Sequence, residues 1–395
     1  MVFFDDPNVM NFLGSIMGFV VLSILFFFSP RLMLAQISSS LEKTAMVIEG
    51  YSREARQIVM KKTSKKPSHD MKEKIDSFLD FFSIQPVTLD PFGAVKRIEH
   101  IEELTEKRFK YFVKRIAPKM SPEEQAELVM GFAGAVSLNQ VSKIVRHYVE
   151  MIKKTKNVQL AMLLQMQMPM IEKMSKALLS GTESFANGWA VGDSAGGLVV
   201  ARMVGDSKMK EFEEDTLIVK KNIKGRSVIL VKPRGPGGRL GKLGKTVERL
   251  SRQKVAKIIT IDAAAKLEGE KTGSVAEGVG VAIGGIGVDR SYIENLATNK
   301  DIPLDSFVVK MSQEEAIMPM VPDILKATDK MIGLVEKNIS ETTEKGLIIV
   351  VGVGNTTGIG NDKKATIEAE KKIKEIAAMM AKREEKEKKK GWFGF

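Results

Sequence analysis

Cysteine is absent from the 395 residues, and histidine occurs only three times. Without Cys the chain has no disulfide, no thiolate nucleophile and no Cys-based zinc or iron–sulfur site. His69, His100 and His147 lie far apart and lack metal-ligand spacing such as HExxH. No histidine follows residue 147, so the second half of the chain has no Ser–His or Cys–His catalytic pair of its own.

Aromatic residues are also scarce, at 6%, while the formal net charge is +12. The basic residues occur in short runs without interleaved aromatic rings, unlike a surface that stacks single-stranded nucleic acid. We therefore predict no specific nucleic-acid partner. Anionic lipid head groups are the simpler partner for this charge, because the chain also carries a candidate membrane segment. Solvated helix faces are the alternative explanation of the basic runs.

The candidate membrane segment runs from Asn11 to Ser29 and contains no charged residue. About 20 apolar residues are needed for a helix to span a bilayer. A signal peptide fits less well, because Asp5 and Asp6 precede the run and basic residues follow it from Arg31 onward. We predict a single-pass anchor in residues 1–35 at the cell membrane, with the N-terminus outside and the body cytoplasmic.

Residues 36–188 are predicted to form an all-α domain. Helix starts are indicated by Asp90-Pro91 and by Ser121-Pro122-Glu123-Glu124, which combine a capping side chain, proline and, at the second, acidic residues. The predicted helices span Gln36–Lys66, Lys72–Phe82, Pro91–Ile116, a segment from Ser121, Ser137–Lys154 and Val158–Leu179. Several of the 23 Met residues lie on these helices, and such flexible side chains would suit packing in a homo-oligomer.

Residues 189–361 have a different residue pattern, in which short β-branched runs lie between glycine turns and helices. This alternation predicts an α/β domain with a mostly parallel sheet covered on both faces. The predicted strands are Thr216–Lys220 and Ser227–Lys232, which form a hairpin, then Lys257–Asp262, Phe307–Lys310 and Leu347–Val351. The predicted helices in this part are Thr246–Gln253 and Pro322–Ile339. Residues 362–395 are predicted as a charged helix with a basic and aromatic tail.

Three turns in the α/β part combine glycine with a carboxylate or an amide. They are Gly192-Asp193-Ser194-Ala195-Gly196-Gly197, Ile261-Asp262-Ala263 and Gly352-Val353-Gly354-Asn355. Ligands of open parallel sheets bind beyond the carboxyl ends of the strands, where the second and third turns fall. We expect the three turns to converge there. Alternatively, Asp193 is an N-cap for the helix that follows it, and Asp262 caps a strand end or holds the loop Glu268–Gly280.

These turns resemble motifs of the hydrogenase-maturation and spore-germination endopeptidases, which share a phosphorylase/hydrolase-like α/β domain. That domain begins with a strand and GxGN, continues with an acidic turn that opens a helix, and later has an (I/V)-D-A strand end. Here Gly352–Asn355 supplies GxGN last, so the part from Gly188 to Gly360 resembles a circularly permuted form. As a whole, the chain resembles an archaeal membrane-anchored family catalogued as domain of unknown function 1512.

The peptidase resemblance implies that Asp193 and Asp262 are a catalytic carboxylate pair. Two carboxylates that share a site split their pKa values, so that one can act as acid and the other as base. In the maturation peptidases a histidine completes a metal site, and this chain has none in its second half. A divalent metal between Asp193 and Asp262 remains an alternative. The predicted ligand-binding residues nearby are Gly192, Gly196, Lys266, Glu268, Glu270, Gly352, Gly354 and Asn355.

The leading hypothesis is therefore a membrane-anchored cytoplasmic hydrolase, an aspartate-dependent endopeptidase with a protein substrate. The first alternative is a non-catalytic membrane scaffold that keeps a peptidase-like fold and self-assembles. The second is an anion- or nucleotide-binding module that uses the basic, glycine-rich loop Arg234–Lys245, with Arg239, Lys242 and Lys245. That loop misses the P-loop pattern GxxxxGK[ST] by one position, because Gly238 stands one residue too early.

Overall fold

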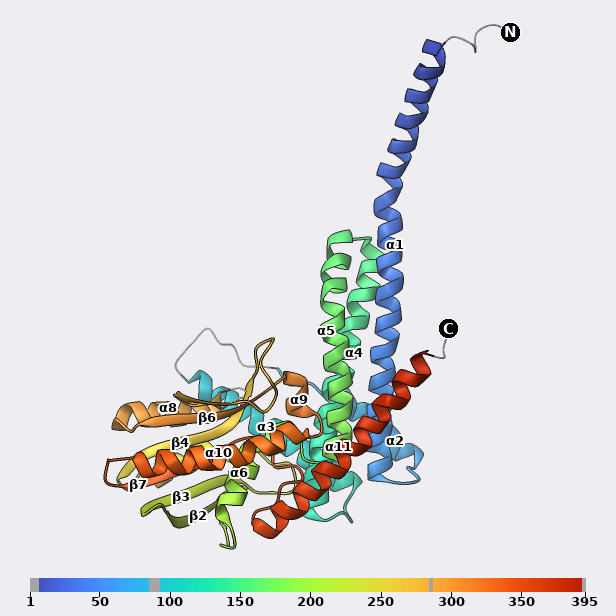
Figure 1. Cartoon of the computed structure of the whole chain (residues 1–395). Helices are drawn as coiled ribbons and strands as arrows, with labels where there is room; N and C mark the ends of the chain where they lie inside the picture. Colours follow the sequence, from blue (N-terminus) through green and yellow to red (C-terminus); the bar gives the residue numbers. More distant parts are fainter. Residues whose placement is uncertain (1–6, 85–92, 284–286, 393–395) are drawn as a thin grey trace. The chain divides into compact units, whose positions relative to one another are not determined.

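The computed structural model describes residues 7–84, 93–283 and 287–392. Side chains are described at 15–20, 31–84, 93–283, 287–383, 385, 386 and 389. The chain forms two compact units. The first contains residues 1–52 and 139–176, and the second contains residues 53–138 and 177–395. Three long helices run from one unit into the other (Figure 1), namely α1 (Pro7–Thr63), α4 (Pro122–Thr155) and α5 (Val158–Asn187).

The first unit is built from parts of these three helices. Its core contains Leu41 and Ile48 from α1, Val145 from α4 and Leu164 from α5. At its rim, the Arg146 guanidinium binds the carboxylates of Glu42 and Glu49, each at 2.6 Å, and Lys153 also binds Glu42 at 2.6 Å. Hydrogen bonds from Lys153 and Arg146 hold the pKa of Glu42 below its usual value.

The sequence predicted separate helices on both sides of residue 35, but α1 is continuous across it. Likewise, the predicted helices from Ser121 and over Ser137–Lys154 are one helix, α4. In α4 the junction contains Gly131 and Gly134, which lie inside the helix and pack closely against Ala186 and Thr182 of α5. Pro30 lies inside α1 and α1 continues through it, although an interior proline removes one backbone hydrogen bond.

One helix in the described part of the chain, α4, has the length and apolar composition of a membrane span. In its most apolar window 44% of the residues are buried in the protein, as expected for a bundle helix. The predicted anchor Asn11–Ser29 lies in α1, where most side chains fall outside the described set. Those that are described there include Ile16, Met17, Phe19 and Val20, and all four are exposed.

Two further helices, α2 (His69–Leu79) and α3 (Ala94–Ile116), belong to the second unit. The Ser68 side chain caps α2, which therefore starts three residues earlier than predicted. At the start of α4, Glu124 accepts hydrogen bonds from the Ser121 N–H and hydroxyl, which confirms this predicted start. The predicted cap at Asp90-Pro91 lies outside the described residues.

The sheet of the second unit has the strand order β1-β2-β3-β7-β4-β6-β5. Strands β3, β7, β4 and β6 run parallel, whereas β1, β2 and β5 join antiparallel to their neighbours. The mostly parallel core of the sheet is thus confirmed. The strands are β1 (Lys210–Glu213), β2 (Thr216–Ile223), β3 (Arg226–Pro233), β4 (Val255–Ala265), β5 (Val275–Val279), β6 (Leu304–Met311) and β7 (Leu347–Gly352).

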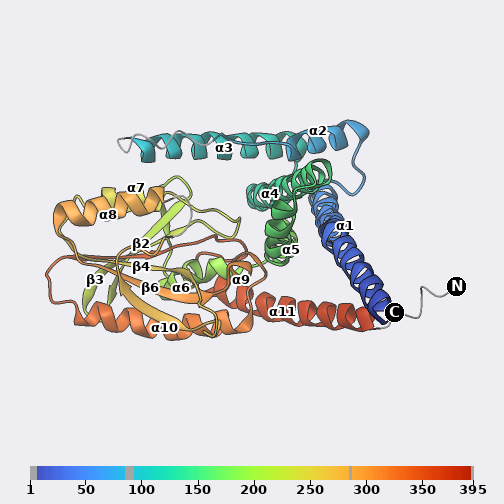
Figure 2. The ribbon, with the colours of Figure 1, turned by 90° about the horizontal axis from the view of Figure 1, so that it is seen from above.

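Helices cover both faces of this sheet (Figure 2). On one face, α7 (Leu243–Leu250) and α8 (Val288–Lys300) pack against alternate residues of β3, β4 and β7. The opposite face carries α6 (Ala195–Val204), α10 (Pro322–Glu341) and α11 (Lys363–Trp392). Two short helices lie next to each other: η1 (Gly192–Ser194), directly before α6, and α9 (Gln313–Ile317), directly before α10.

Arg202 ties the three helices of the second face together. Its guanidinium donates to Glu370 of α11 and to Thr328 and Asp329 of α10. Only 11% of this side chain is exposed, so the charge is compensated where water has little access.

The sequence missed β1, β5 and α8. The stretch Glu268–Gly280 was predicted as a loop, yet β5 lies within it. A strand at the edge of a sheet needs one partner only, here β6, so tertiary pairing overrides its weak local preference.

We predict that Gly196→Ala destabilises the protein by about 2 kcal/mol or more. A β-carbon at Gly196 would overlap the carbonyl oxygens of Ile261, within β4, and of Val353, the residue after β7. The matched control is Gly333→Ala in α10, where a β-carbon meets nothing within 4 Å and the change should stabilise by about 1 kcal/mol. Urea unfolding of both variants measures this, and equal effects would show that the contact at Gly196 relaxes.

Candidate functional site

The candidate site lies at the carboxyl end of β7, between β3 and β4. The helices that follow β3 and β4 along the chain, α7 and α8, cover one face of the sheet, whereas α11, which follows β7, covers the other. The connections therefore diverge on the two sides of β7. In open α/β sheets, ligands bind in the crevice at such a topological switch point.

The three predicted segments come together here, but Ile261-Asp262-Ala263 is not a turn: β4 does not end at Asp262 as predicted and continues to Ala265, because these residues pair with β6. The Val353 N–H donates to the Ile261 carbonyl at 2.8 Å, which joins the residue after β7 to β4. Gly196 lies against the Ile261 and Val353 carbonyls, and Gly352 lies against the Gly196 carbonyl. Gly354, with a φ of +102°, lies against the Asp193 carbonyl. Glycine is needed at these positions because the backbones touch.

Asp193 lies in η1, partly buried, at the start of the segment that leads into α6. Its Oδ2 accepts a hydrogen bond from the Asn355 N–H at 2.8 Å. Burial raises the pKa of the Asp193 carboxyl, and this hydrogen bond lowers it by a smaller amount. The alternative in which Asp193 caps α6 is wrong, because the N-cap is Ser194 and no side chain caps that helix.

Asp262 follows Ile261 in β4, and only 2% of its surface is exposed. Its Oδ1 accepts a hydrogen bond from the Ala263 N–H at 2.6 Å. Asp262 therefore belongs to the strand that Gly196 touches, and Asp193 belongs to the turn that reaches the same edge from α6. Both carboxylates come from backbone segments that the close glycine contacts hold in place.

Asn355 contributes its main chain to this site rather than its side chain. The side-chain Oδ1 accepts hydrogen bonds from the Thr357 N–H at 2.8 Å and the Thr357 hydroxyl at 2.6 Å. Its Nδ2 donates to the Gly238 carbonyl at 3.4 Å. The Asn355 side chain thus fixes the loop after β7, and this loop positions the Asn355 N–H that donates to Asp193.

Lys266, Glu268 and Glu270 lie on the connection between β4 and β5. Lys266 donates to the Thr272 hydroxyl at 3.0 Å, Glu270 binds Lys310, and Glu268 is exposed. Gly192 is linked to this connection through Glu315, whose carboxylate accepts from Thr272 at 2.8 Å and whose carbonyl lies against Gly192.

Lys232 was not singled out from the sequence, yet it is fully buried at the end of β3. Its Nζ donates to the carbonyls of Pro233 at 2.9 Å and Gly360 at 3.2 Å, and to Oδ1 of Asn361 at 2.8 Å. Burial lowers the pKa of Lys232 to about 7. The available signal was a lysine inside an otherwise apolar strand, Val228–Val231, directly before a proline.

The basic loop Arg234–Lys245 is held by the segment after β7. The Thr356 hydroxyl donates to the Arg234 carbonyl at 2.8 Å, and the Gly358 N–H donates to the Pro236 carbonyl at 3.0 Å. These contacts fix the loop beside the candidate site.

Each cation that the anion-binding alternative needs has a carboxylate partner in the described structure. Arg239 binds Glu123 and Asp215, Lys242 lies near Glu103 and Glu106, and Lys245 binds Glu99 and Glu103. The N-terminus of α7 is also occupied, because the Gly244 N–H donates to Asp289 at 2.7 Å. The loop therefore lacks the spare positive charge that this alternative requires.

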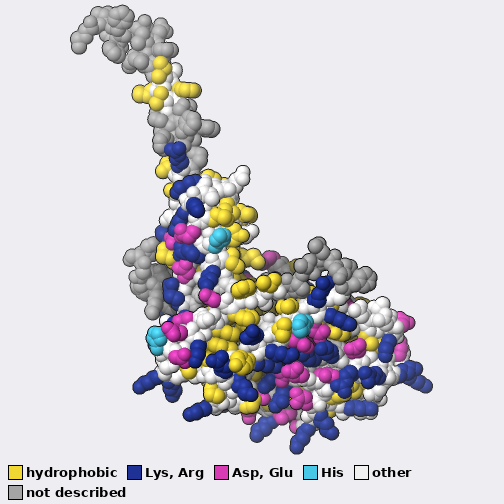
Figure 3. All heavy atoms as spheres, turned by 180° about the vertical axis from the view of Figure 1, so that it is seen from behind, with side chains coloured by type: hydrophobic (Ala, Val, Ile, Leu, Met, Phe, Trp, Pro, Cys, Tyr) yellow, Lys and Arg dark blue, Asp and Glu magenta, His cyan; other side chains and the backbone are white. Residues whose placement is uncertain are grey.

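The charge pattern agrees with this pairing. Figure 3 shows Lys and Arg interspersed with Asp and Glu over one face, rather than gathered in a single basic field. No group of three or more His, Asp or Glu side chains is placed to hold a metal ion within residues whose side chains are described. The two carboxylates of the candidate site by themselves do not make a complete metal centre.

Comparison with known proteins identifies the family. Residues 15–188 match the N-terminal domain of the family described as "Protein of unknown function (DUF1512)", and residues 191–360 match its C-terminal domain. The chain belongs to this family, as the sequence resemblance indicated. No curated protein and no solved structure matches the chain.

We predict that the free energy of unfolding depends on pH through Lys232. The unfolded chain keeps this proton up to the ordinary lysine pKa of 10.5, whereas the folded chain releases it at about 7. Wild type should therefore gain stability over Lys232→Met between pH 7 and pH 9.5, by up to roughly 1.4 kcal/mol per pH unit. Denaturant unfolding at four pH values tests this. A constant difference between the two proteins would show that Lys232 stays charged in the fold.

Proposed function

We propose that this member of the DUF1512 family is a membrane-anchored hydrolase that uses Asp193 and Asp262 to cleave an amide bond in a protein substrate. The observation that supports the proposal most is the convergence of the three turns at the switch point beside β7. Two carboxylates are supplied there by segments whose close backbone contacts leave them little freedom. Sites with preorganised carboxylates at such an edge are suited to proton transfer.

Two carboxyl groups that share a site would take different roles, because the charge of one disfavours ionisation of the other. Burial raises the pKa of Asp193, which favours its protonated form as the general acid. Asp262, in its ionised form, would accept a proton from a water molecule while that water attacks the amide carbonyl carbon. Asp193 would then give its proton to the departing amine as the carbon–nitrogen bond breaks. Two carboxylates and one water balance this reaction without a metal.

The membrane anchor is a separate part of the proposal. Residues 11–29 carry no charge, and the described side chains within them, including Met17 and Phe19, are exposed in the protein. Exposed apolar residues along a helix without partners are suited to lipid. By the positive-inside tendency, Arg31 and the later basic residues would put the body on the cytoplasmic side.

A second candidate is a non-catalytic scaffold that assembles through the first unit. The observation in its favour is a set of exposed apolar side chains on α5 and α4 in that unit. They are Met162, Leu163, Met166 and Met170 on α5, and Ile144 and Tyr148 on α4. Exposed apolar groups at this density are typical of association surfaces, and the partner would be a second copy of the chain.

Hydrolysis should fall at least 100-fold in both Asp193→Asn and Asp262→Asn, because each variant removes one proton-transfer group. The full chain in nanodiscs would be assayed on unfolded casein by mass spectrometry of the released peptides. Asp206→Asn, an exposed carboxylate after α6, is the matched control and should keep full activity.

A measurement of folding keeps this test interpretable. Because burial raises the pKa of Asp193, the ionised group costs free energy at pH 7, and Asp193→Asn should unfold no more easily than wild type. Wild-type chain that releases no peptide while forming defined oligomers by light scattering would contradict the hydrolase and support the scaffold.

The topology prediction uses the absence of Cys from the natural chain. Single variants Asn8→Cys and Lys65→Cys would be treated in intact cells with a maleimide that does not cross membranes. Asn8→Cys should react from outside, and Lys65→Cys should react only after the cells are permeabilised. The reverse pattern would invert the proposed orientation, and equal labelling of both would exclude the anchor.

A further inference from the structure

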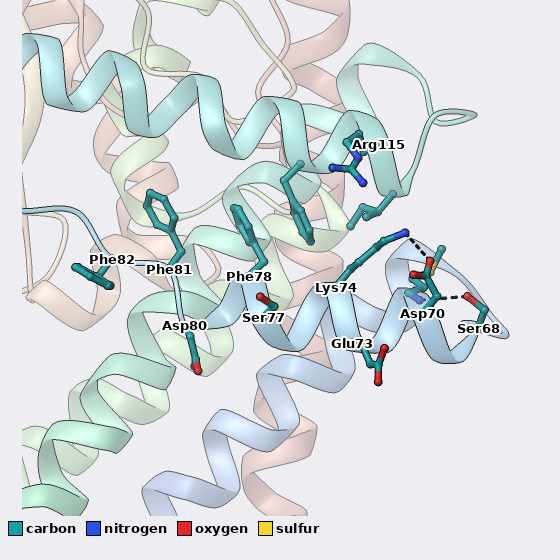
Figure 4. Close-up of a pocket in the computed structure, with 13 residues that line it drawn as sticks. Ser68, Asp70, Glu73, Lys74, Ser77, Phe78, Asp80, Phe81, Phe82 and Arg115 are labelled. Atoms are coloured by element: carbon teal, nitrogen blue, oxygen red, sulfur yellow. Dashed lines mark hydrogen bonds and ion pairs between the residues drawn. The ribbon is translucent and has the colours of Figure 1, made fainter.

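Two hollows of the second unit differ in what their linings offer a ligand. The larger, of about 620 Å³, lies between α2 and α3, and Figure 4 shows charged side chains and phenyl rings around it. Its charged lining residues have both signs: Asp70, Glu73, Asp80, Lys74 and Arg115. This lining favours neither an anion nor a cation, so the smaller hollow is the more informative of the two.

The smaller hollow, of about 260 Å³, lies over β5 and β6 at the edge of the sheet. Ala276 and Gly278 of β5 stand opposite Val308 and Ser306 of β6, and residues two apart on a strand share one face. A β-carbon at Gly278 would meet nothing within 4 Å. The hollow is smaller than the sites of drug-sized ligands, so it suits an apolar side chain rather than a whole molecule.

Hydrogen bonds fix which backbone groups of β5 face its neighbour. The Lys310 N–H donates to the Ser274 carbonyl at 2.8 Å, and the Gly280 N–H donates to the Leu304 carbonyl at 3.1 Å. In an antiparallel pair, every second residue of a strand bonds the partner strand. The even-numbered residues from Ser274 to Gly280 therefore face β6.

The odd-numbered residues Val275, Glu277 and Val279 consequently turn their N–H and C=O groups away from β6. No strand in the described part of the chain pairs with β5 on that side. Val279 is 92% exposed, and Glu277 and Gly278 are exposed as well. The outer edge of β5 thus offers a row of backbone donors and acceptors to another strand.

The opposite edge of the sheet is protected in a way that β5 is not. There β1 carries Lys210, Glu211 and Glu213, and its register with β2 shifts between the two glutamates. Charged side chains and bulges are the usual means by which proteins keep edge strands from pairing. β5 contains neither lysine nor proline, and its pairing with β6 is regular.

Glu277 gives the free edge a negative charge at its middle. Its Oε1 accepts a hydrogen bond from Nδ2 of Asn338 on α10 at 3.2 Å. The neighbouring Asp305 is already paired with Lys257 at 2.9 Å. No cation pairs with Glu277 among the residues whose side chains the structure describes. A strand that adds to β5 would therefore gain from a basic residue at this position.

A second copy of β5 fits this edge poorly. Antiparallel pairing of two identical strands along their whole length puts the two-fold axis at Glu277, so that the two Glu277 side chains stand opposite each other. Like charges in directly opposite positions destabilise a strand pair. Five residues also extend only about 17 Å, which is short for the ~800 Å² that each partner buries in a stable dimer.

We propose that the outer edge of β5 binds an extended segment of a partner protein, which adds antiparallel to β5 with a basic residue opposite Glu277. Only a polypeptide strand carries N–H and C=O groups at the spacing of Val275, Glu277 and Val279. The residues on either side of the basic one point to the other face, where they cover Gly278 and the smaller hollow. They are apolar, because alanine and valine side chains line that hollow. This site does not depend on the hydrolase proposal, since it uses neither carboxylate of the candidate site.

The test is fluorescence polarisation of the peptide fluorescein-Ser-Thr-Val-Lys-Val-Thr-Ser-amide with the full chain in phosphatidylcholine nanodiscs, with empty nanodiscs subtracted. Methylation of the backbone nitrogen of the peptide lysine, which faces β5, should weaken binding by about tenfold or more. Methylation of the valine nitrogen that follows, which faces away, is the matched control and should change binding by about twofold at most.

Variants of the chain test the same geometry from the other side. Val279→Pro should abolish binding, because proline removes an outward N–H and leaves the bonds to β6 in place. Val279→Thr keeps that N–H and should bind as wild type. Glu277→Lys should weaken the lysine peptide about fivefold and favour the peptide with glutamate in its place. Glu248→Lys makes the same charge change on an exposed residue of α7 and should alter neither affinity.

Three outcomes would overturn the proposal. One is an equal effect of the two methylated peptides, and another is an unchanged preference for the lysine peptide in Glu277→Lys. The third is a dimer of the full chain that Val279→Pro abolishes, which would assign the edge to a second copy. Melting curves that match wild type establish that the variants remain folded, and the comparison of methylated peptides uses wild type and needs no variant.

Discussion

The structure of the second unit depends on the insertion of the last strand, β7, between β3 and β4. All six residues of β7 are buried, and it pairs in parallel with a strand on each side. Full burial of a Val or Ile side chain stabilises the fold by about 1.5–3 kcal/mol. Alternate residues of β7 belong to the cores on the two faces of the sheet, so this one strand contributes to both. Its position also brings the loop after it, residues 353–361, onto the loop after β3 and the turn before α6.

The properties of the candidate site follow from that packing. Gly196, Gly352 and Gly354 let three backbone segments touch, and this contact leaves Asp193 in surroundings that raise its pKa. On the neighbouring strand, Lys232 fixes the same loop through Gly360 and Asn361, and its burial lowers its pKa to about 7. Asp193, whose protonated form is favoured, and Lys232, whose neutral form is favoured, therefore lie on segments joined by the loop after β7. Such opposite shifts are the mark of a region built from buried polar groups rather than from solvent-exposed ones.

Several expectations failed for a reason that local sequence does not contain. Arg239, Lys242 and Lys245 formed a plausible anion site until α3 and the start of α4 supplied Glu99, Glu103 and Glu123 as partners. Likewise β5 is a strand because it pairs with β6 at the edge of the sheet, although its glycines favour a loop. In each case the partner lies far away in the chain.

The sequence by itself determined the class of each part: long helices in the first half, a mostly parallel sheet in the second, and three glycine turns at strand or helix ends. Periodicity and turn residues encode these features within a few positions, so they can be read directly. Only the tertiary structure decided that α1 and α4 run on without a break, that the last strand lies in the middle of the sheet, and that Lys232 is buried. It also paired the basic loop with acidic side chains of α3 and α4. These outcomes depend on contacts between residues far apart in the chain, such as Lys245 with Glu99 and Lys232 with Gly360, whose energies no local pattern contains.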